Sequence, residues 1–267
     1  MSVIHDPSST QPSALFLFAH QDDEFGIFQK IIDEKSNGRR VFCAYLTDGA
    51  FAGQSSLRRN RESLAVLIHL GVREEDIFFA GQTLSIPDGG LLDRLDLAFE
   101  WLCNWLSHHH MVSAIYLPSW EGGHQDHDAL HALGVIAADE AGLMKHVKQF
   151  PLYNGYKCTG PLFRVFLPLS KNGEVEMTKI QWATRFQFLR YCLSYPSQFT
   201  TWVGLFPFVM FHFIFYGTQA LQLVSRERLY QRPHSGTLYY ERRQFYTWEK
   251  MSEKLLRFID LKMAGES

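Results

Sequence analysis

The sequence predicts an α/β fold in which a mostly parallel sheet carries helices on both faces. Two observations lead to this fold class. Short apolar runs alternate with segments of helical periodicity through the first half of the chain, which is typical of parallel strands joined by covering helices. Hydrophobic residues make up 46% and charged residues 20% of the 267-residue chain, as in ordinary globular proteins.

The elements follow one another in a regular order. Four runs are expected as strands: ALFLFAH (14–20), RVFCAYLTDG (40–49), DIFFAG (76–81) and VSAIYLPSW (112–120). Four segments are expected as helices: 23–35, 56–70, 89–109 and 126–142. In Rossmann-like sheets of this kind, ligands bind beyond the carboxyl ends of the strands. The candidate site is therefore sought where strands end.

After about Lys145 the alternation fades, and aromatic residues become frequent. Strand-like pieces at 147–156 and 161–169 precede an expected helix over 179–193 and a helical tail that begins near Phe245. No linker or repeat separates the halves. We therefore expect an N-terminal tail (1–13) and a single domain (14–267), with a metal-site core over about 14–145 and an aromatic-rich C-terminal elaboration over about 146–267.

The stretch from Thr201 to Val224 is the most apolar part of the chain. It contains Pro207 and His212 and ends in the charged run 226–228. Its apolar core, 203–215, is shorter than the roughly 20 residues that a membrane span requires. We expect no transmembrane span here. Packing against the protein's own core and contact with a membrane surface or a partner both stay open.

Charge and cysteine content narrow the function classes. The 26 Lys and Arg residues nearly balance the 28 Asp and Glu residues, so no basic field favours nucleic acid. The four cysteines lie far apart without a CxxC motif, which fits reduced thiols in a cytoplasmic protein. The expected location is the cytoplasm, including the inner face of the membrane. The N-terminus lacks the basic region of a secretory signal. No oligomeric state follows from the sequence.

Two polar clusters follow apolar strands. His20, Asp22 and Asp23 follow the first strand, and His124 and His127 follow a later one. Two imidazoles and one carboxylate are the ligand set of a catalytic zinc with an open position. Asp22 could then accept a proton from water, and His124 could donate to a developing oxyanion. Acidic residues at a helix start also serve simply as caps, so each cluster alone has a structural explanation.

Together the clusters resemble a known family. The motif AHQDDE (19–24) paired with HQDH (124–127) is similar to the AHPDDE and HxDH motifs of the zinc-dependent PIG-L/LmbE-like N-acetylglucosaminyl deacetylases. Weaker similarities are TDG (47–49), RRNRE (58–62), LGV (70–72) and IPDGG (86–90). The resemblance covers roughly residues 14–141.

The resemblance implies roles for eight residues. They are His20, Asp23 and His127 as metal ligands, Asp22 as general base, His124 as the group that assists the intermediate or the leaving amine, Asp126 as the acid that orients His124, and Arg59 and Asp88 as substrate contacts. One position departs from the family pattern, because Gln21 replaces the proline that stiffens the first motif.

The implied function is metal-dependent removal of an N-acetyl group from an N-acetylglucosamine-type sugar or glycoconjugate. Zinc is the expected cofactor, with Fe²⁺ or Co²⁺ as alternatives for the same ligands. The expected partner is an N-acetylated sugar or its conjugate, including a lipid-linked one, with peripheral membrane contact and no nucleic acid. Two alternatives are kept: a deacylase of another amide, such as a longer N-acyl or antibiotic-type glycoconjugate, and a noncatalytic metal-containing sugar-binding protein.

Overall fold

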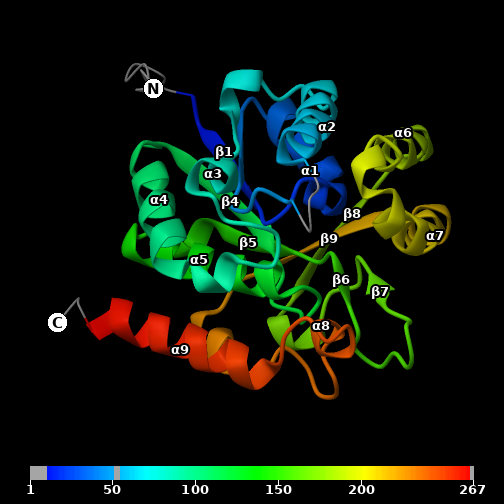
Figure 1. Cartoon of the computed structure of the whole chain (residues 1–267). Helices are drawn as coiled ribbons and strands as arrows, with labels where there is room; N and C mark the ends of the chain where they lie inside the picture. The colour runs from blue at the N-terminus through cyan, green and yellow to red at the C-terminus, as the bar shows by residue number, and fades with distance from the viewer. Residues whose placement is uncertain (1–10, 51–54, 265–267) are drawn as a thin grey trace.

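A seven-stranded mixed sheet forms the centre of the molecule, with helices on both faces (Figure 1). The computed structural model describes residues 11–50 and 55–264. The strand order is β3-β2-β1-β4-β5-β9-β8. The first five strands are parallel, whereas β9 runs antiparallel to β5 and to β8. The predicted α/β fold with a mostly parallel sheet is confirmed.

The strands of the main sheet are β1 (Ser13–Phe18), β2 (Arg40–Tyr45), β3 (Ile77–Phe78), β4 (Val112–Pro118), β5 (Val147–Phe150), β8 (Val175–Lys179) and β9 (Thr218–Leu223). A second, two-stranded sheet pairs β6 (Tyr153–Asn154) with β7 (Arg164–Val165). The α-helices are α1 (Phe28–Ser36), α2 (Ser56–His69), α3 (Ala80–Leu84), α4 (Leu95–Ser107), α5 (Gln125–Glu140), α6 (Trp182–Cys192), α7 (Phe199–Phe215), α8 (Tyr239–Arg242) and α9 (Trp248–Ala264). Short 3₁₀ helices include η1 (Asp23–Gly26), η3 (Leu91–Asp93) and η6 (Pro196–Gln198).

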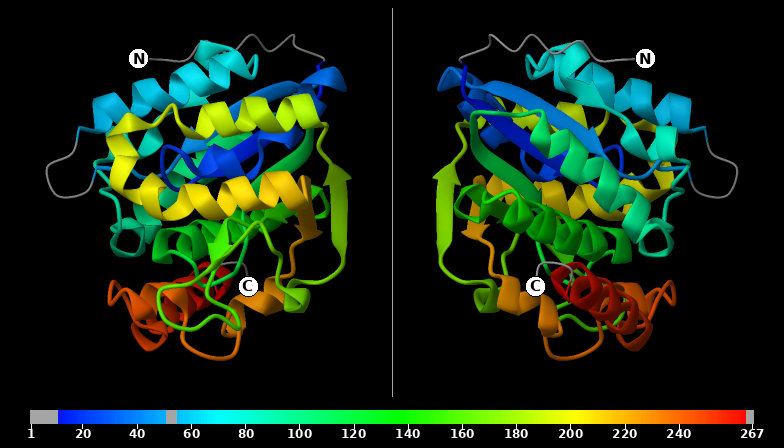
Figure 2. Two further views of the ribbon diagram at one scale, coloured as in Figure 1. Left: turned by 90° about the vertical axis from the view of Figure 1, so that its right-hand side faces the viewer. Right: turned by 90° about the vertical axis from the view of Figure 1, so that its left-hand side faces the viewer.

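Side chains alternate along the fully buried strand β1 and so divide the core in two. Leu15 and Leu17 face a cluster built with α4, α5 and α9. Phe16 and Phe18 face the opposite cluster, built with α1, α2, α6 and α7. Helices of the C-terminal half thus pack on both faces of the sheet (Figure 2). The aromatic-rich elaboration belongs to the same domain as the first half.

The strand order reverses between β1 and β4. From β1 the chain adds β2 and β3 on one side, and β4 then returns to the other side of β1. Such a reversal leaves room at the carboxyl ends of the two strands, where ligands of α/β proteins bind. His20 follows β1 here, and His124 follows β4 as the N-cap of α5.

Several predicted boundaries are wrong. The helix expected at 89–109 begins only at Leu95, because Gly89 has φ +82° and a 3₁₀ turn intervenes. The helix expected from Asp23 starts as η1, and α1 begins at Phe28. The strand expected at 76–81 keeps two residues before α3. The strand expected at 147–156 splits between β5 in the main sheet and β6 in the small one.

The C-terminal half differs most from expectation. The strand expected at 161–169 is confined to β7, and Lys179 ends a strand instead of starting a helix. The apolar stretch forms the helix α7 despite Pro207. Together with η6 it makes a 20-residue segment, Pro196–Phe215, which by length and composition alone is long and apolar enough to cross a membrane. Of this segment, 33% is buried in the protein.

Candidate metal centre and active site

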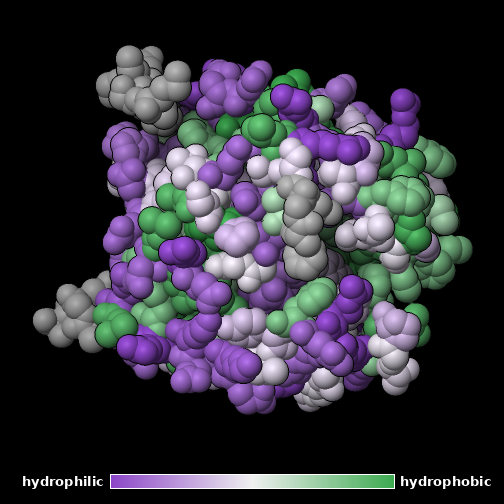
Figure 3. All heavy atoms as spheres, viewed as in Figure 1, coloured by the Kyte–Doolittle hydropathy of each residue, from purple (hydrophilic) through white to green (hydrophobic). Residues whose placement is uncertain are grey.

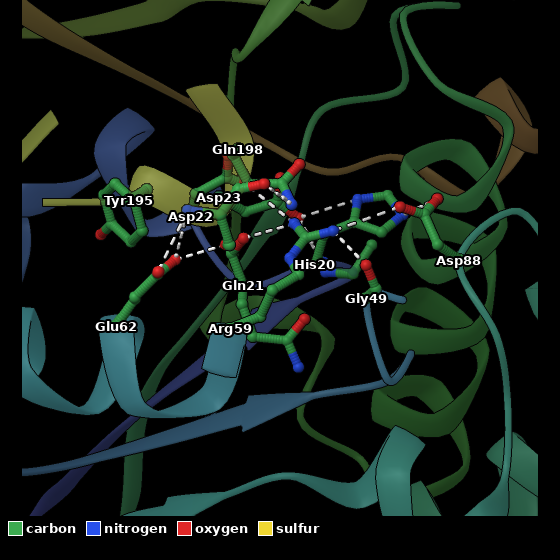
Figure 4. A network of polar contacts seen from close by, with 12 residues as sticks. His20, Gln21, Asp22, Asp23, Gly49, Arg59, Glu62, Asp88, Tyr195 and Gln198 are labelled. Atoms are coloured by element: carbon green, nitrogen blue, oxygen red, sulfur yellow. Dashed lines mark hydrogen bonds and ion pairs between the residues drawn. The ribbon is translucent and has the colours of Figure 1, made fainter. Parts of the chain in front are cut away.

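The chain makes a strained turn directly after β1. Asp22 has φ 110°, a left-handed conformation that is uncommon for a residue with a Cβ. Its backbone N–H donates to the Glu24 carboxylate at 3.1 Å, and the Asp23 N–H donates to the carbonyl oxygen of His20 at 3.2 Å. The turn brings the side chains of His20, Asp22 and Asp23 into one buried cluster (Figure 4).

Three of the predicted ligands converge. His20 Nδ1 lies 3.3 Å from His127 Nε2, and His127 Nε2 lies 3.0 Å from Asp23 Oδ1. His20 Nδ1 lies 3.7 Å from Asp23 Oδ2. Ligand atoms that sit 2.0–2.1 Å from a tetrahedral zinc are about 3.3 Å from one another. The spacing and the donor set of two imidazole nitrogens and one carboxylate oxygen therefore fit a zinc-like metal ion.

Hydrogen bonds hold two of these ligands in place. Asp23 Oδ2 accepts the backbone N–H groups of Ala19 at 3.0 Å and His20 at 2.8 Å. His20 Nε2 donates to Asp126 Oδ2 at 3.0 Å, which leaves the Nδ1 lone pair directed at the cluster. The Nδ1 atom of His127 is buried without a hydrogen-bond partner among the described residues, and its ring packs against Tyr153 with centroids 5.6 Å apart.

Asp126 does not occupy the place that the sequence analysis gave it. Its carboxylate contacts His20, and it also accepts the backbone N–H groups of Gly89 at 2.6 Å and Leu91 at 3.2 Å. Its link to His124 is through its own backbone N–H, which donates to His124 Nδ1 at 3.2 Å. The side chain that orients His20 is therefore Asp126, and His124 is held by the backbone at the start of α5.

Arg59 and Asp88 lie in the same cluster. Arg59 Nη2 is 3.3 Å from Asp22 Oδ1, and Arg59 Nη1 is 3.3 Å from Asp88 Oδ2. The guanidinium also donates to the carbonyl oxygens of Gln21, at 2.6 Å, and of Gly49. Since Arg59 is only 3% exposed, its first task is to neutralise and position the two carboxylates.

The carboxylate of Asp88 lies close to two imidazoles, those of His20 and His124. Its Oδ1 atom is 3.3 Å from His20 Nε2 and 3.8 Å from His124 Nε2. Although burial opposes it, attraction to His20, His124 and Arg59 holds the pKa of Asp88 below its usual range. Asp88 is therefore an anion in this cluster.

The pKa values of the last two predicted groups, Asp22 and His124, are displaced in opposite directions. Burial raises the pKa of Asp22 to about 8, against the opposing charge of Arg59. Burial, together with the neighbouring His20, lowers the pKa of His124 to about 4. A carboxyl group that titrates near neutral pH can both take and return a proton.

Gln21 fills the position of the family's proline with a hydrogen-bonded side chain. Its Nε2 donates to Asn60 Oδ1 at 2.7 Å, and Asn60 in turn donates to Gln82 at 2.6 Å. A Cβ on Gly49 would meet the Gln21 side-chain oxygen at 1.9 Å. Contacts to α2 and to the loop after β2 thus constrain this turn where the ring of a proline would otherwise do so.

The C-terminal half adds a wall that sequence reasoning did not find. Tyr195, directly before η6, donates to Glu24 at 2.8 Å, and Ser197 N–H donates to Glu62 at 3.1 Å, so η6 is tied to the first motif and to α2. No local pattern marks η6 as part of a site, because its contacts join residues more than a hundred positions apart.

Aromatic rings continue this wall away from the cluster. Tyr153 packs on His127 and lies 6.1 Å from Phe163 between ring centroids. Phe163 lies 4.6 Å from Phe208 of α7. Trp202 of α7 is buried against Phe25.

Comparison with protein families agrees with this geometry. Residues 15–138 match the family described as PIG-L: GlcNAc-PI de-N-acetylase. These residues are similar to the PIG-L family core. All eight predicted site residues lie within the matched range. A search of curated protein sequences finds no match.

Several solved structures share the fold of most of this chain. The zinc-inhibited form of teicoplanin deacetylase Orf2 matches with a TM-score of 0.59 and 14% identity, over 81% of this chain and 100% of that one. The N,N'-diacetylchitobiose deacetylase from Pyrococcus horikoshii matches with a TM-score of 0.58 and 15% identity, over 85% and 88% of the two chains. The A40926 pseudoaglycone deacetylase Dbv21 matches with a TM-score of 0.57 and 16% identity, over 81% and 98%.

Proposed function

We propose that this protein is a divalent-metal-dependent N-deacetylase, an amide hydrolase that removes the acetyl group from an N-acetylglucosamine-type sugar or glycoconjugate. The observation that carries the proposal is the convergence of His20 Nδ1, His127 Nε2 and the Asp23 carboxylate at the end of β1. The PIG-L family match and the named deacetylases among the structural matches support it.

His20, Asp23 and His127 would hold the metal ion, with zinc favoured and Fe²⁺ or Co²⁺ compatible with the same donors. When bound, such an ion supplies Lewis acidity, which polarises an amide carbonyl and favours deprotonation of water. Asp126 supports this ligand set because its carboxylate accepts from His20 Nε2 and so fixes the tautomer of His20.

The other side chains move protons and charge. Asp22 takes the proton of the attacking water, and Arg59 keeps its carboxylate oriented at 3.3 Å. His124 stabilises the oxyanion that develops on the carbonyl oxygen of the acetyl group or assists the departing amine. As the C–N bond breaks, the amine nitrogen receives a proton from Asp22 or His124, and the products are acetate and a free amino sugar.

The substrate is proposed to lie between the cluster and the aromatic wall. Asp88, which pairs with Arg59, contacts His20, and Tyr153 packs on His127, so these residues border the proposed ligands. An aromatic face suits the apolar face of a sugar ring or of its conjugate. A lipid-linked sugar at the cytoplasmic face of a membrane is compatible with the apolar helix α7 at the end of this wall.

A second candidate is deacylation of an antibiotic-type glycoconjugate. Two of the matched structures are, by their names, deacetylases of the teicoplanin and A40926 pathways. The two candidates share the metal centre and the proton transfers, and they differ only in the acyl group and in the rest of the substrate.

Acetate release tests the proposal. Metal-stripped protein is assayed on N-acetylglucosamine and a panel of its conjugates, with and without added zinc, beside Asp22→Asn. We expect activity that zinc restores and that the variant loses while it still binds metal. Tight metal binding without acetate release from any substrate would favour another amide substrate or the noncatalytic sugar-binding alternative.

A further inference from the structure

The α6–α7 face carries a concentration of exposed apolar side chains. Of 21 large apolar side chains exposed in the described residues, ten lie between residues 182 and 216. They are Trp182, Phe186, Leu193, Phe199, Val203, Met210, Phe211, Ile214, Phe215 and Tyr216. Helices α6 and α7 lie side by side on the outside of the sheet (Figure 2), and apolar side chains gather over them at the right edge of Figure 3. Monomeric proteins rarely leave so large an apolar patch exposed without a use.

The exposed side of α7 lacks the charges that a surface helix normally carries. Residues 199–216 contain no Asp, Glu, Lys or Arg. Phe199 is 70% exposed and Phe215 67%, whereas Val209 and Phe213 on the other side are buried in the core. The helix is therefore anchored by one face and presents an uncharged apolar face outward.

Basic residues lie within and directly before α6. Lys179, Arg185 and Arg190 are the charged residues of 177–216, a stretch without an acidic residue that Glu174 and Glu176 precede. Arg185 stacks over exposed Trp182 with its guanidinium carbon 4.3 Å from the ring centroid. Basic groups beside Trp, Phe and Leu are the composition of segments that lie in the interface of an anionic bilayer.

A specific protein partner fits this face less well. Protein interfaces carry about one hydrogen bond per 100–200 Å². The α7 part of the face offers only the hydroxyl groups of Thr200, Thr201 and Tyr216 among exposed side chains, and α6 adds Gln187 and Arg190. A lipid surface needs no such partners from the protein.

Both ends of α7 are fixed to the same body, which favours an in-plane position over a span. Ser197, just before the helix, is bonded to Glu62 of α2. Just after it, Thr218 begins β9, which pairs with β5 and β8 in the central sheet. Crossing a bilayer would require the helix to leave the sheet.

We propose that the α6–α7 face docks this protein on the surface of an anionic phospholipid bilayer. The docked face lies close to the candidate metal centre, since Tyr195, directly before η6, donates to Glu24 of the first motif at 2.8 Å. The proposal goes beyond the proposed function and does not rest on it, because lipid binding is measured without turnover.

Co-sedimentation with vesicles tests it on the full chain. Vesicles of equal parts phosphatidylcholine and phosphatidylglycerol are compared with vesicles of phosphatidylcholine alone. We expect binding to the anionic vesicles that salt weakens. Phe186→Ser combined with Phe215→Ser should weaken partition about tenfold or more. Lys179→Ala combined with Arg190→Ala should weaken it about fivefold per charge, on anionic vesicles only.

The matched control exchanges equally apolar, exposed residues elsewhere. Met111→Ser combined with Leu261→Ser, at 47% and 66% exposure, should leave vesicle binding unchanged. Thermal unfolding of each variant checks that the fold is retained. The proposal is overturned if the wild-type chain does not sediment with anionic vesicles, or if the control loses as much binding. It is equally overturned if the chain forms a dimer that Phe186→Ser with Phe215→Ser dissociates, because the face would then cover a second copy.

Discussion

At the scale of single residues, the candidate metal centre depends on the groups that hold the proposed ligands as much as on the ligands themselves. His20 can direct Nδ1 at the cluster because Asp126 accepts from its Nε2, and Asp126 is itself held by the N–H groups of Gly89 and Leu91. The loop after Ile86 therefore positions His20, which follows β1, through the Asp126 carboxylate. Arg59 has the corresponding task for Asp22 and Asp88.

Replacing Asp126 by Asn should therefore weaken metal binding about 10–100-fold, because the carboxylate that orients His20 is lost. Metal affinity is measured by competition with a chelator. The control is Asp128→Asn, two positions further along α5. Its carboxyl group accepts the backbone N–H groups of Glu121 and Gly122 instead of orienting an imidazole, so this change should leave metal affinity unchanged. Wild-type affinity in Asp126→Asn would show that this hydrogen bond does not support the site.

At the scale of elements, a buried acid joins α1 to the sheet. Glu34 of α1 accepts from the hydroxyl of Tyr116 on β4 at 2.6 Å and pairs with Lys30 at 3.1 Å and with Arg39. Burial opposes ionisation, but these partners lower the pKa of Glu34 below its usual 4.5. The stabilisation is thus present above pH 4.5 and is lost as the pH falls through the lower pKa of the folded state.

Glu34→Gln should lower the free energy of unfolding by about 1.5–3 kcal/mol at pH 7. The difference from wild type should shrink when the pH falls below 4.5, because the unfolded wild-type chain then binds a proton that the folded state does not yet bind. Urea unfolding of both proteins at neutral and acidic pH measures it. A difference that grows with acidification would contradict the assigned direction of the pKa shift.

The elements also show how much of the fold could be predicted from the sequence. The alternation before residue 142 predicted the parallel strands and the site at their carboxyl ends, because each apolar run was followed by a turn and a periodic helix. It misplaced the start of α4, since Gly89 and Gly90 stand in a loop held by Asp126. It did not predict α7 as a helix, because apolar residues on every face leave no helical period to detect.

Contacts between distant segments account for what the sequence did not predict of the site. The three ligands could be proposed because each follows a strand end. The target of the Asp126 carboxylate, and the bond from Tyr195 beside η6 to Glu24, depend on how loops meet across the sheet. The antiparallel pair β8–β9 arises in the same way, since no local signal specifies its partner β5.

At the scale of the whole molecule, the two halves share their cores. Leu255 and Met251 of α9 are buried against the face that also holds α4 and α5. The half that contains the proposed metal ligands therefore loses part of its core when the packing of α9 is weakened. Helix α9 itself contributes none of the eight predicted site residues.

Leu255→Ala should lower the free energy of unfolding by about 2–5 kcal/mol, because it leaves a cavity against α5. The control Leu261→Ala changes the same residue type on the same helix at 66% exposure, and its effect should stay within about 0.5 kcal/mol. Chemical denaturation measures both. Equal effects would mean that α9 does not pack as described.

The identity of the metal ligands is tested most directly by X-ray absorption at the zinc edge of the zinc-loaded protein. We predict two imidazole nitrogens at about 2.0–2.1 Å together with carboxylate oxygen, and one imidazole fewer in His127→Ala. The contradicting result is a zinc coordination shell that His127→Ala leaves unchanged, or one that contains sulfur.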